Sequence, residues 1–203
     1  MGILEVNHIK KVYKTKIGGT EVEALKDIHF SVESGEFVAI MGESGSGKTT
    51  FFRCLCGLER PEEGEVSGID AFSVQFQEDR LCEEYSAVKN LEMVMGDARE
   101  ARKALTWLLP EEALGQPCHE LSGGMKRRVS LVRAMEAGAQ CVLLDEPFTG
   151  LDEENREKAY EYIRTHANGR IIMIATHIRP WENMPEDVQK GEGLWERIRE
   201  TQE

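Results

Sequence analysis

The residues with the clearest chemistry form a glycine-rich stretch, GESGSGKTT, at positions 42–50. An apolar run at 36–41 precedes it and predicts a strand, and residues 51–55 can continue it as a helix. In this setting the glycines let successive backbone N–H groups point at one anion, and the helix start adds unpaired N–H groups. We therefore predict a nucleoside triphosphate site in which Lys48 contacts the β- and γ-phosphates and the Thr49 hydroxyl binds Mg²⁺.

A pair of carboxylates, Asp145 and Glu146, follows the apolar run at 141–144. A continuous apolar run of this length is typical of a strand buried in a parallel sheet, and such sheets bind ligands at the carboxyl ends of their strands. Asp145 is then expected to hold Mg²⁺, directly or through water, and Glu146 to polarise a water for attack on the γ-phosphate. A solvated strand end is the alternative, and the phosphate loop in the same chain favours the chemical interpretation.

A second glycine pair stands in the segment Leu-Ser-Gly-Gly at 121–124. Ser122 could simply cap the helix that follows. The two glycines, however, cost helix propensity, about 1 kcal/mol each relative to alanine. A helix start that exposes backbone N–H groups is again an anion site. Two anion sites in a chain that binds one nucleotide suggest that two chains share each nucleotide.

The elements that must position these groups alternate between strands and helices, which indicates an α/β fold. Apolar patterns predict strands at 3–7, 28–32, 37–41, 72–76, 141–145 and 170–175. Helical patterns cover 87–109, 122–137 and 153–166, with a charged candidate at 194–199. Residues 10–14 and the turn at Gly18-Gly19 suggest an antiparallel edge, and an apolar stripe within 122–137 is expected to pack into the core.

Composition limits the class of protein. The chain has 203 residues, 40% hydrophobic and 31% charged, which suits one globular domain with room for a subdomain. The net charge of −12 argues against a nucleic-acid partner. No apolar run approaches the ~20 residues that span a membrane. The five cysteines form no C-x-x-C pair and are expected to be reduced thiols of a cytosolic protein, with a zinc site as the weaker alternative.

Several motifs occur in the order found in ATP-binding cassette (ABC) ATPases: the phosphate loop, Gln77, residues 121–124, residues 141–146, Leu151-Asp152 and His177. Over about residues 3–178 the chain resembles the ATP-binding subunit of an ABC transporter. The resemblance implies an α/β P-loop NTPase of ABC type, with a mixed sheet core, an antiparallel β edge and a small helical subdomain. We expect a single domain, 1–203, in which 1–80 and 138–203 form the catalytic core and 84–137 form the helical subdomain that carries the signature.

The resemblance also implies residue roles. Nucleotide-binding positions are Gly42, Ser44, Gly45, Gly47, Lys48, Thr49 and Thr50, together with Ser122, Gly123, Gly124 and Asp152, which act across a dimer. Thr49, Gln77 and Asp145 are the expected metal ligands, and Glu146, His177 and Gln77 the expected catalytic residues. Tyr13 is expected to stack on adenine, which gives little selectivity between ATP and GTP. Departures from the family pattern include Met125, where the family usually has Gln, the short distance from Lys48 to Gln77, and the segment after Ile178, which lacks the usual closing helix and strand.

The implied function is ATP-driven dimerisation that powers transport. It requires ATP, Mg²⁺, a second ATPase subunit, expected in a homodimer, and an integral-membrane permease that would hold the chain at the cytoplasmic face of the membrane. No nucleic acid is expected. Residues 1–50 resemble ATPases of lipoprotein-release and antimicrobial-peptide export systems. Residues 76–81, 121–125 and 146–148 resemble nitrate, sulfonate or taurine importers, which we favour because these residues surround the coupling loop. The alternative is an ABC ATPase of a soluble assembly complex of the iron–sulfur type.

Overall fold

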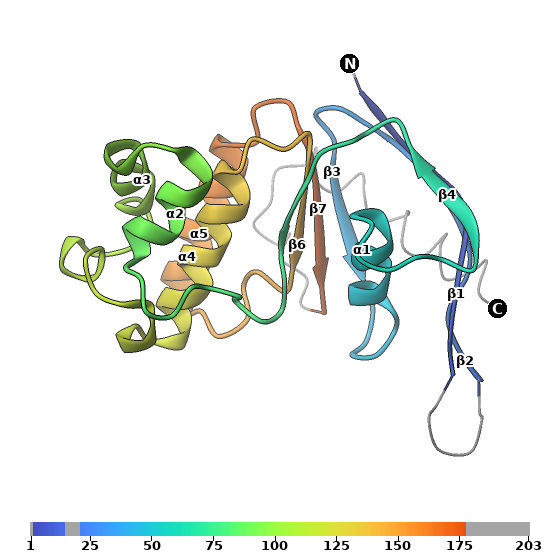
Figure 1. Ribbon diagram of the computed structural model, residues 1–203, viewed down its shortest axis with the longest axis horizontal. Helices are drawn as coiled ribbons and strands as arrows, with labels where there is room; N and C mark the ends of the chain where they lie inside the picture. The colour runs from blue at the N-terminus through green and yellow to red at the C-terminus, as the bar shows by residue number, and fades with distance from the viewer. Residues whose placement is uncertain (1, 15–20, 178–203) are drawn as a thin grey trace.

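The structure is a computed structural model that describes residues 2–14 and 21–177. Its elements form successive layers, and Figure 1 shows them from right to left: an antiparallel sheet, the single helix α1, a parallel sheet and a group of four helices. This arrangement of a parallel sheet between helices, with a second antiparallel sheet outside, is the mixed α/β architecture predicted from the strand–helix alternation.

The antiparallel sheet contains β1 (Ile3–Lys14), β2 (Glu21–Glu33) and β4 (Glu63–Ser67), in the order β2-β1-β4. Its existence confirms the predicted antiparallel edge, although the strands extend well beyond 3–7 and 28–32. The predicted turn at Gly18-Gly19 lies outside the described residues. The strand β4 was not predicted, because its sequence, EGEVS, carries little apolar character and its strand geometry depends on pairing with β1.

The parallel sheet contains β3 (Phe37–Met41), β5 (Phe72–Gln75), β6 (Cys141–Asp145) and β7 (Ile171–Thr176), in the order β3-β7-β6-β5. Every residue of β6 and β7 is buried, as their continuous apolar sequences predict. In the register, Met41 pairs with Thr176 and Asp145 pairs with Ala175. The segments that follow β3, β7 and β6 therefore emerge side by side at one edge of the sheet.

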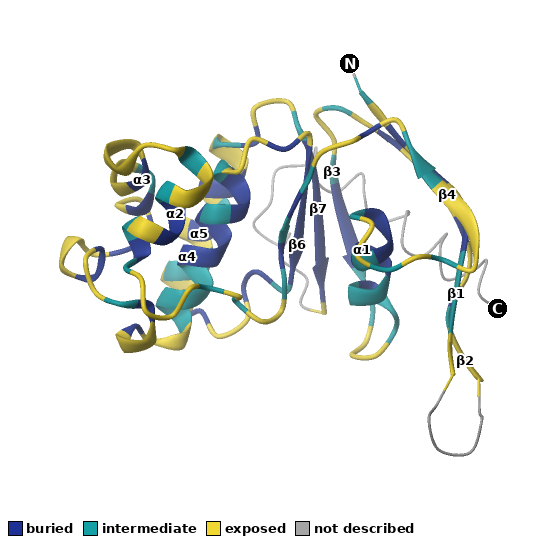
Figure 2. Ribbon diagram, viewed as in Figure 1, coloured by how far each residue is buried: buried dark blue, intermediate teal, exposed yellow. Residues whose placement is uncertain are grey.

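The helix α1 (Lys48–Leu55) is enclosed between the two sheets. Phe51 and Phe52 are fully buried and belong to the same core cluster as Ile9 of the antiparallel sheet and Leu143 of the parallel sheet. Burial of a phenylalanine side chain contributes about 1.5–3 kcal/mol, so this pair anchors α1 firmly. The dark blue residues of α1 in Figure 2 mark this contact. The anchoring fixes the first turn of α1 beside the edge where β3 ends.

The other face of the parallel sheet is covered by α4 (Gly123–Glu136) and α5 (Glu153–Thr165), with α2 (Ala87–Met95) and α3 (Ala98–Leu105) beyond them. Short 3₁₀ turns follow at Glu111–Ala113 and Cys118–Glu120. The predicted apolar stripe of α4 is confirmed, because Val129, Val132 and Met135 are buried and Met125 is half-buried. The helix candidate at 194–199 lies outside the described residues.

The five free cysteines differ in exposure, which predicts their order of alkylation. Cys82 is exposed, whereas burial raises the pKa of Cys54 to about 11 and that of Cys141 to about 12. Because the thiolate is the nucleophile, we expect iodoacetamide at neutral pH to modify Cys82 first and to leave Cys141 unmodified. Mass spectrometry of tryptic peptides measures this order, with the urea-unfolded chain as the control in which all five react. Early labelling of Cys141 would contradict the burial.

Candidate nucleotide site

The loop between β3 and α1 owes its shape to two glycines with left-handed backbone. Gly45 has φ +85° and Gly47, the N-cap of α1, has φ +94°. A Cβ atom on Gly47 would also lie 2.6 Å from the carbonyl oxygen of Ala24 on β2. Gly47 is thus required both by its backbone angle and by the close approach of a neighbouring strand. The sequence motif predicted the first requirement, and only the packing of β2 reveals the second.

This loop borders a cavity of about 640 Å³ at the edge of the parallel sheet. Lining residues are Tyr13, Val22, Ala24, Glu43, Ser44, Gly45, Ser46, Gly47, Lys48, Thr49, Thr50, Gln77, Asp145, Glu146, Thr149 and His177. The cavity therefore joins the predicted loop to the predicted acidic pair, the glutamine, the histidine and the N-terminal tyrosine. These groups come from distant parts of the chain, and the parallel register brings them to one edge.

The Lys48 side chain folds back over the loop that precedes it. Its ammonium group donates to the carbonyl oxygens of Gly42, at 2.7 Å, and Glu43, at 3.0 Å, and the residue is 7% exposed. Among the residues that the structure describes, this buried cation is bonded to neutral carbonyls and has no partner of full opposite charge. A phosphate in the cavity would supply that partner.

Thr49 and Asp145 form an oxygen pair in the floor of the cavity. The Thr49 hydroxyl donates to Asp145 Oδ2 at 2.6 Å, and Asp145 is 1% exposed. Burial raises the pKa of Asp145, and the bond from Thr49 opposes that effect. A hydroxyl and a carboxylate oxygen are the hard ligands that Mg²⁺ prefers, so this donor set fits the predicted metal. A divalent cation would also compensate the buried carboxylate charge.

Glu146 stands where β6 leaves the sheet, and its backbone is unusual. Its φ is +52°, a left-handed conformation that few residues other than glycine adopt. Its N–H still donates to the carbonyl oxygen of Ala175 at 2.8 Å, so the turn begins at this residue. The carboxylate is 12% exposed, lies 2.9 Å from His177 Nδ1 and accepts from the Thr149 hydroxyl at 3.4 Å. Such backbone strain is concentrated at functional sites, where the surrounding structure enforces it.

Tyr13 and Gln77 also line this cavity. The Tyr13 hydroxyl bonds to Glu59 and, at 3.3 Å, to the Thr50 hydroxyl, which ties β1 to α1. The carbonyl oxygen of Gln77 accepts from the Arg127 guanidinium at 2.6 Å, which ties this residue to α4. The first contact holds the tyrosine ring and the second holds the Gln77 backbone, and both residues line the cavity.

The predicted signature residues and Asp152 lie elsewhere. Ser122 Oγ accepts from the Met125 N–H at 3.2 Å and caps α4, and Asp152 caps α5 through Asn155 N–H at 2.8 Å. Among the described residues, those that line the cavity do not include Ser122, Gly123, Gly124 or Asp152. Within one chain the structure thus assembles the loop, the acidic pair and the histidine, and keeps the signature apart from them.

Outside the predicted loop at 42–50, three lining residues were not predicted from the sequence: Val22, Ala24 and Thr149. Thr149 stands three positions after Glu146, and a search for hydroxyls near the acidic pair would have found it. Val22 and Ala24 carry no chemical signal, since only the packing of β2 against the loop places them there.

The comparison with known proteins agrees with this geometry. Residues 25–149 match the family of ABC transporters. The chain belongs to that family. The predicted family, the fold class and the ATP-hydrolase class are thereby confirmed, as is the binding of ATP.

Relatives of this ABC chain include both exporters and importers. It is 35% identical over 201 residues to the macrolide export ATP-binding/permease protein MacB of Bradyrhizobium diazoefficiens, covering 86% of this chain and 30% of that protein. It is 31% identical to the lipoprotein-releasing system ATP-binding protein LolD of Idiomarina loihiensis, covering 88% of that protein. It is 36% identical to the aliphatic sulfonates import ATP-binding protein SsuB 3 of Pseudomonas savastanoi pv. phaseolicola, covering 67% of it. The chain thus spans about a third of the MacB-type relatives and most of LolD.

Solved structures show the same fold. The chain matches the ATP-binding cassette MJ0796, in a dimeric post-hydrolysis state bound to ADP and Pi, with a TM-score of 0.80 and 26% identity over 86% of this chain and 88% of that one. A second dimeric structure of that bacterial ABC transporter cassette gives a TM-score of 0.78 and 28% identity. No helix in residues 2–14 and 21–177 is both long and apolar enough to cross a membrane.

Proposed function

We propose that two copies of this chain bind and hydrolyse MgATP at a shared interface and thereby power transport through a separate membrane permease. The main support for this proposal is that the loop, Asp145, Glu146 and His177 of one chain line one cavity, whereas Ser122–Gly124 do not. A site that needs the signature is completed by the signature of a second chain. The solved relatives are dimeric cassettes, which supports this arrangement.

The loop amides and Lys48 would bind the phosphates, since the Lys48 ammonium is already aimed into the loop by its bonds to Gly42 and Glu43. Thr49 and Asp145, with Gln77 beside them, would hold Mg²⁺, which neutralises charge that develops on the phosphates. Most catalysis of phosphoryl transfer consists of such positioning and charge stabilisation. The loop side of the site is therefore formed within one chain.

Glu146 is placed to orient and polarise the attacking water. Its bonds with His177 and Thr149 and its turned backbone hold the carboxylate in the lining of the cavity. His177, 53% exposed in its side chain, lines the same cavity and can also contact a γ-phosphate there. Tyr13, which lines the same cavity, is proposed to stack on the base, and Asp152 to act across the dimer.

The partners and the place of action are part of the same proposal. The permease would hold the chain at the cytoplasmic face of the membrane, with no nucleic acid involved. Residues 1–80 and 138–203 would act as the catalytic core and 84–137 as the helical subdomain. The names of the relatives include exporters and an importer, so the preference for import stays a prediction. They do not favour the soluble assembly complex. Co-purification of a multi-span membrane protein would support transport, and a soluble complex would support assembly.

A mixing experiment tests the shared site. The Lys48→Ala variant lacks the loop function and the Ser122→Arg variant lacks the signature, so each alone should be inactive. In a mixed dimer, the intact loop of the second variant meets the intact signature of the first. An equal mixture should recover about a quarter of wild-type phosphate release, because half the dimers are mixed and each has one complete site.

A matched control uses Lys48→Ala mixed with Glu146→Gln. Both residues line the same cavity of one chain, so no mixed dimer contains a complete site and activity should stay absent. Recovery in both mixtures, or in neither, would contradict the division of the site between loop and signature.

A further inference from the structure

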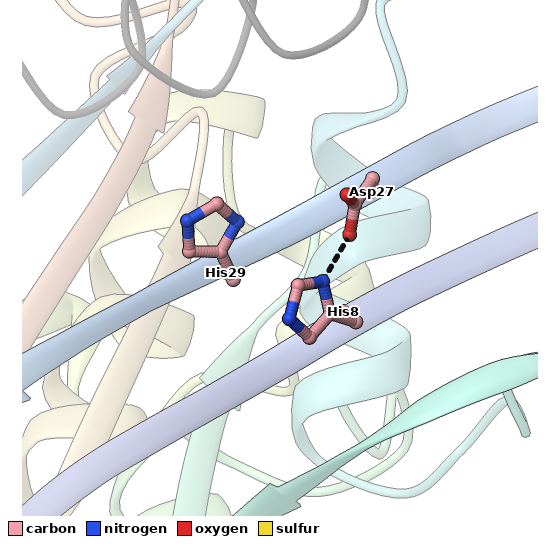
Figure 3. A group of neighbouring side chains, drawn as sticks. All are labelled: His8, Asp27 and His29. Carbon is pink, nitrogen blue, oxygen red and sulfur yellow. Dashed lines mark hydrogen bonds and ion pairs between the residues drawn. The ribbon is translucent and has the colours of Figure 1, made fainter.

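A group of three metal-ligating side chains lies on the antiparallel sheet. It consists of His8 on β1 with Asp27 and His29 on β2, and Figure 3 shows the three side by side. One ligand atom from each lies within 4.8 Å of the others. His8 Nδ1 is 2.7 Å from Asp27 Oδ1, and the two imidazole rings stack with centroids 5.1 Å apart. None of the three lines the nucleotide cavity.

The backbone brings these side chains together through irregularities in both strands. On β1, the pairing steps from Val6–Phe30 to Ile9–Ile28, so Asn7 and His8 oppose His29 alone. This is the arrangement of a β-bulge, which redirects side chains. His8 has φ +52°, and left-handed backbone is enriched at His relative to most residues. The bulge turns His8 toward solvent on the face that carries His29.

The bulge is supported from the other side by β4. A Cβ atom on Gly64 would lie 2.3 Å from the carbonyl oxygens of Asn7 and His8, so a glycine is required at this contact. On β2 a second irregularity, between the Ile9–Ile28 and Lys11–Leu25 pairs, sets Asp27 beside His8. The backbones of three strands therefore fix the positions of the ligand-bearing residues.

We propose that His8, Asp27 and His29 form a binding site for a late first-row divalent cation such as Zn²⁺. Two imidazoles and one carboxylate form a ligand set that suits such cations, whereas Mg²⁺ and Ca²⁺ prefer ligands that are all oxygen. Zinc–ligand bonds of about 2.0–2.2 Å place tetrahedral ligands about 3.4 Å apart, so atoms that lie up to 4.8 Å apart must approach by up to about 1.4 Å. The His8 and Asp27 side chains are 70% and 51% exposed, which leaves them free to rotate that far. Water would complete the coordination.

Zinc calorimetry on the full chain, in buffer without nucleotide or Mg²⁺, tests the site. His29→Ala should weaken zinc binding at this site at least about tenfold, because it removes one of the two nitrogen ligands. His8→Asn removes the other while keeping a residue that tolerates left-handed backbone. His119→Ala is the matched control: an exposed histidine within 4.0 Å of carboxylates but outside the cluster, whose loss should change nothing. Equal affinity and stoichiometry in wild type and His29→Ala would overturn the proposal.

Two further measurements report on the folded site itself. In NMR spectra, zinc should shift the imidazole signals of His8 and His29 and leave those of His119 in place. A cation that bridges β1 and β2 binds the folded chain only, so 100 Kd of zinc should raise the melting temperature of the wild type by about 5–11 °C. That rise should be lost in His29→Ala. An equal rise in both chains, or zinc shifts confined to other histidines, would contradict the site.

Discussion

Replacement of Glu146 by Gln should lower the rate of ATP hydrolysis by at least about 100-fold while ATP binding is retained. The amide has nearly the shape of the carboxylate, so the turned backbone and the neighbouring loop should stay in place. It cannot, however, accept a proton from water. Glu146 lines the cavity and is bonded to His177 and Thr149, whereas the phosphates are expected to bind to Lys48 and the loop amides, so binding should survive.

The measurement pairs phosphate release with equilibrium binding of ATP, on the same preparation. Glu157→Gln is the control, since Glu157 is an exposed carboxylate on α5 and its change removes the same charge. Hydrolysis at the wild-type rate in Glu146→Gln would refute the catalytic role. A comparable loss in Glu157→Gln would show that net charge, rather than the site, sets the rate.

Replacement of Lys48 by Ala should weaken ATP binding by about 10–100-fold, because it removes charged hydrogen bonds to the phosphates worth about 1.5–3 kcal/mol. The same change removes the bonds from the ammonium to the Gly42 and Glu43 carbonyl oxygens. The remaining loop amides should still bind phosphate weakly. This variant therefore differs from Glu146→Gln, which should bind normally and turn over slowly.

Titration with a fluorescent ATP analogue measures the affinity. Lys158→Ala serves as the control: Lys158 is an exposed lysine that pairs with Glu154 on α5. Circular dichroism spectra verify that both variants remain folded. Unchanged affinity in Lys48→Ala would exclude the proposed contact with the phosphates.

The regular elements were largely predictable because their signals are local. The continuous apolar runs of β6 and β7 and the helical spacing of Val129, Val132 and Met135 each depend on neighbours a few positions away. The strand β4 was missed since EGEVS has no such pattern and forms a strand only by pairing with β1. The bulges that bring His8 and His29 together were also missed, because the pairing register of two distant segments cannot be predicted from either segment alone.

For the nucleotide site, residue types and their spacing specify which chemical groups are present: the glycine loop with Lys48 and Thr49, the acidic pair, and His177. The arrangement of these groups depends on how the chain folds. The strand β7 lies between β3 and β6, so His177 meets Glu146 at 2.9 Å, and β2 packs so close to Gly47 that no side chain fits there. Folding also placed Ser122–Gly124 away from the cavity. Residue types set the chemistry because side chains carry it, whereas distances depend on strand order and packing, which only the whole chain specifies.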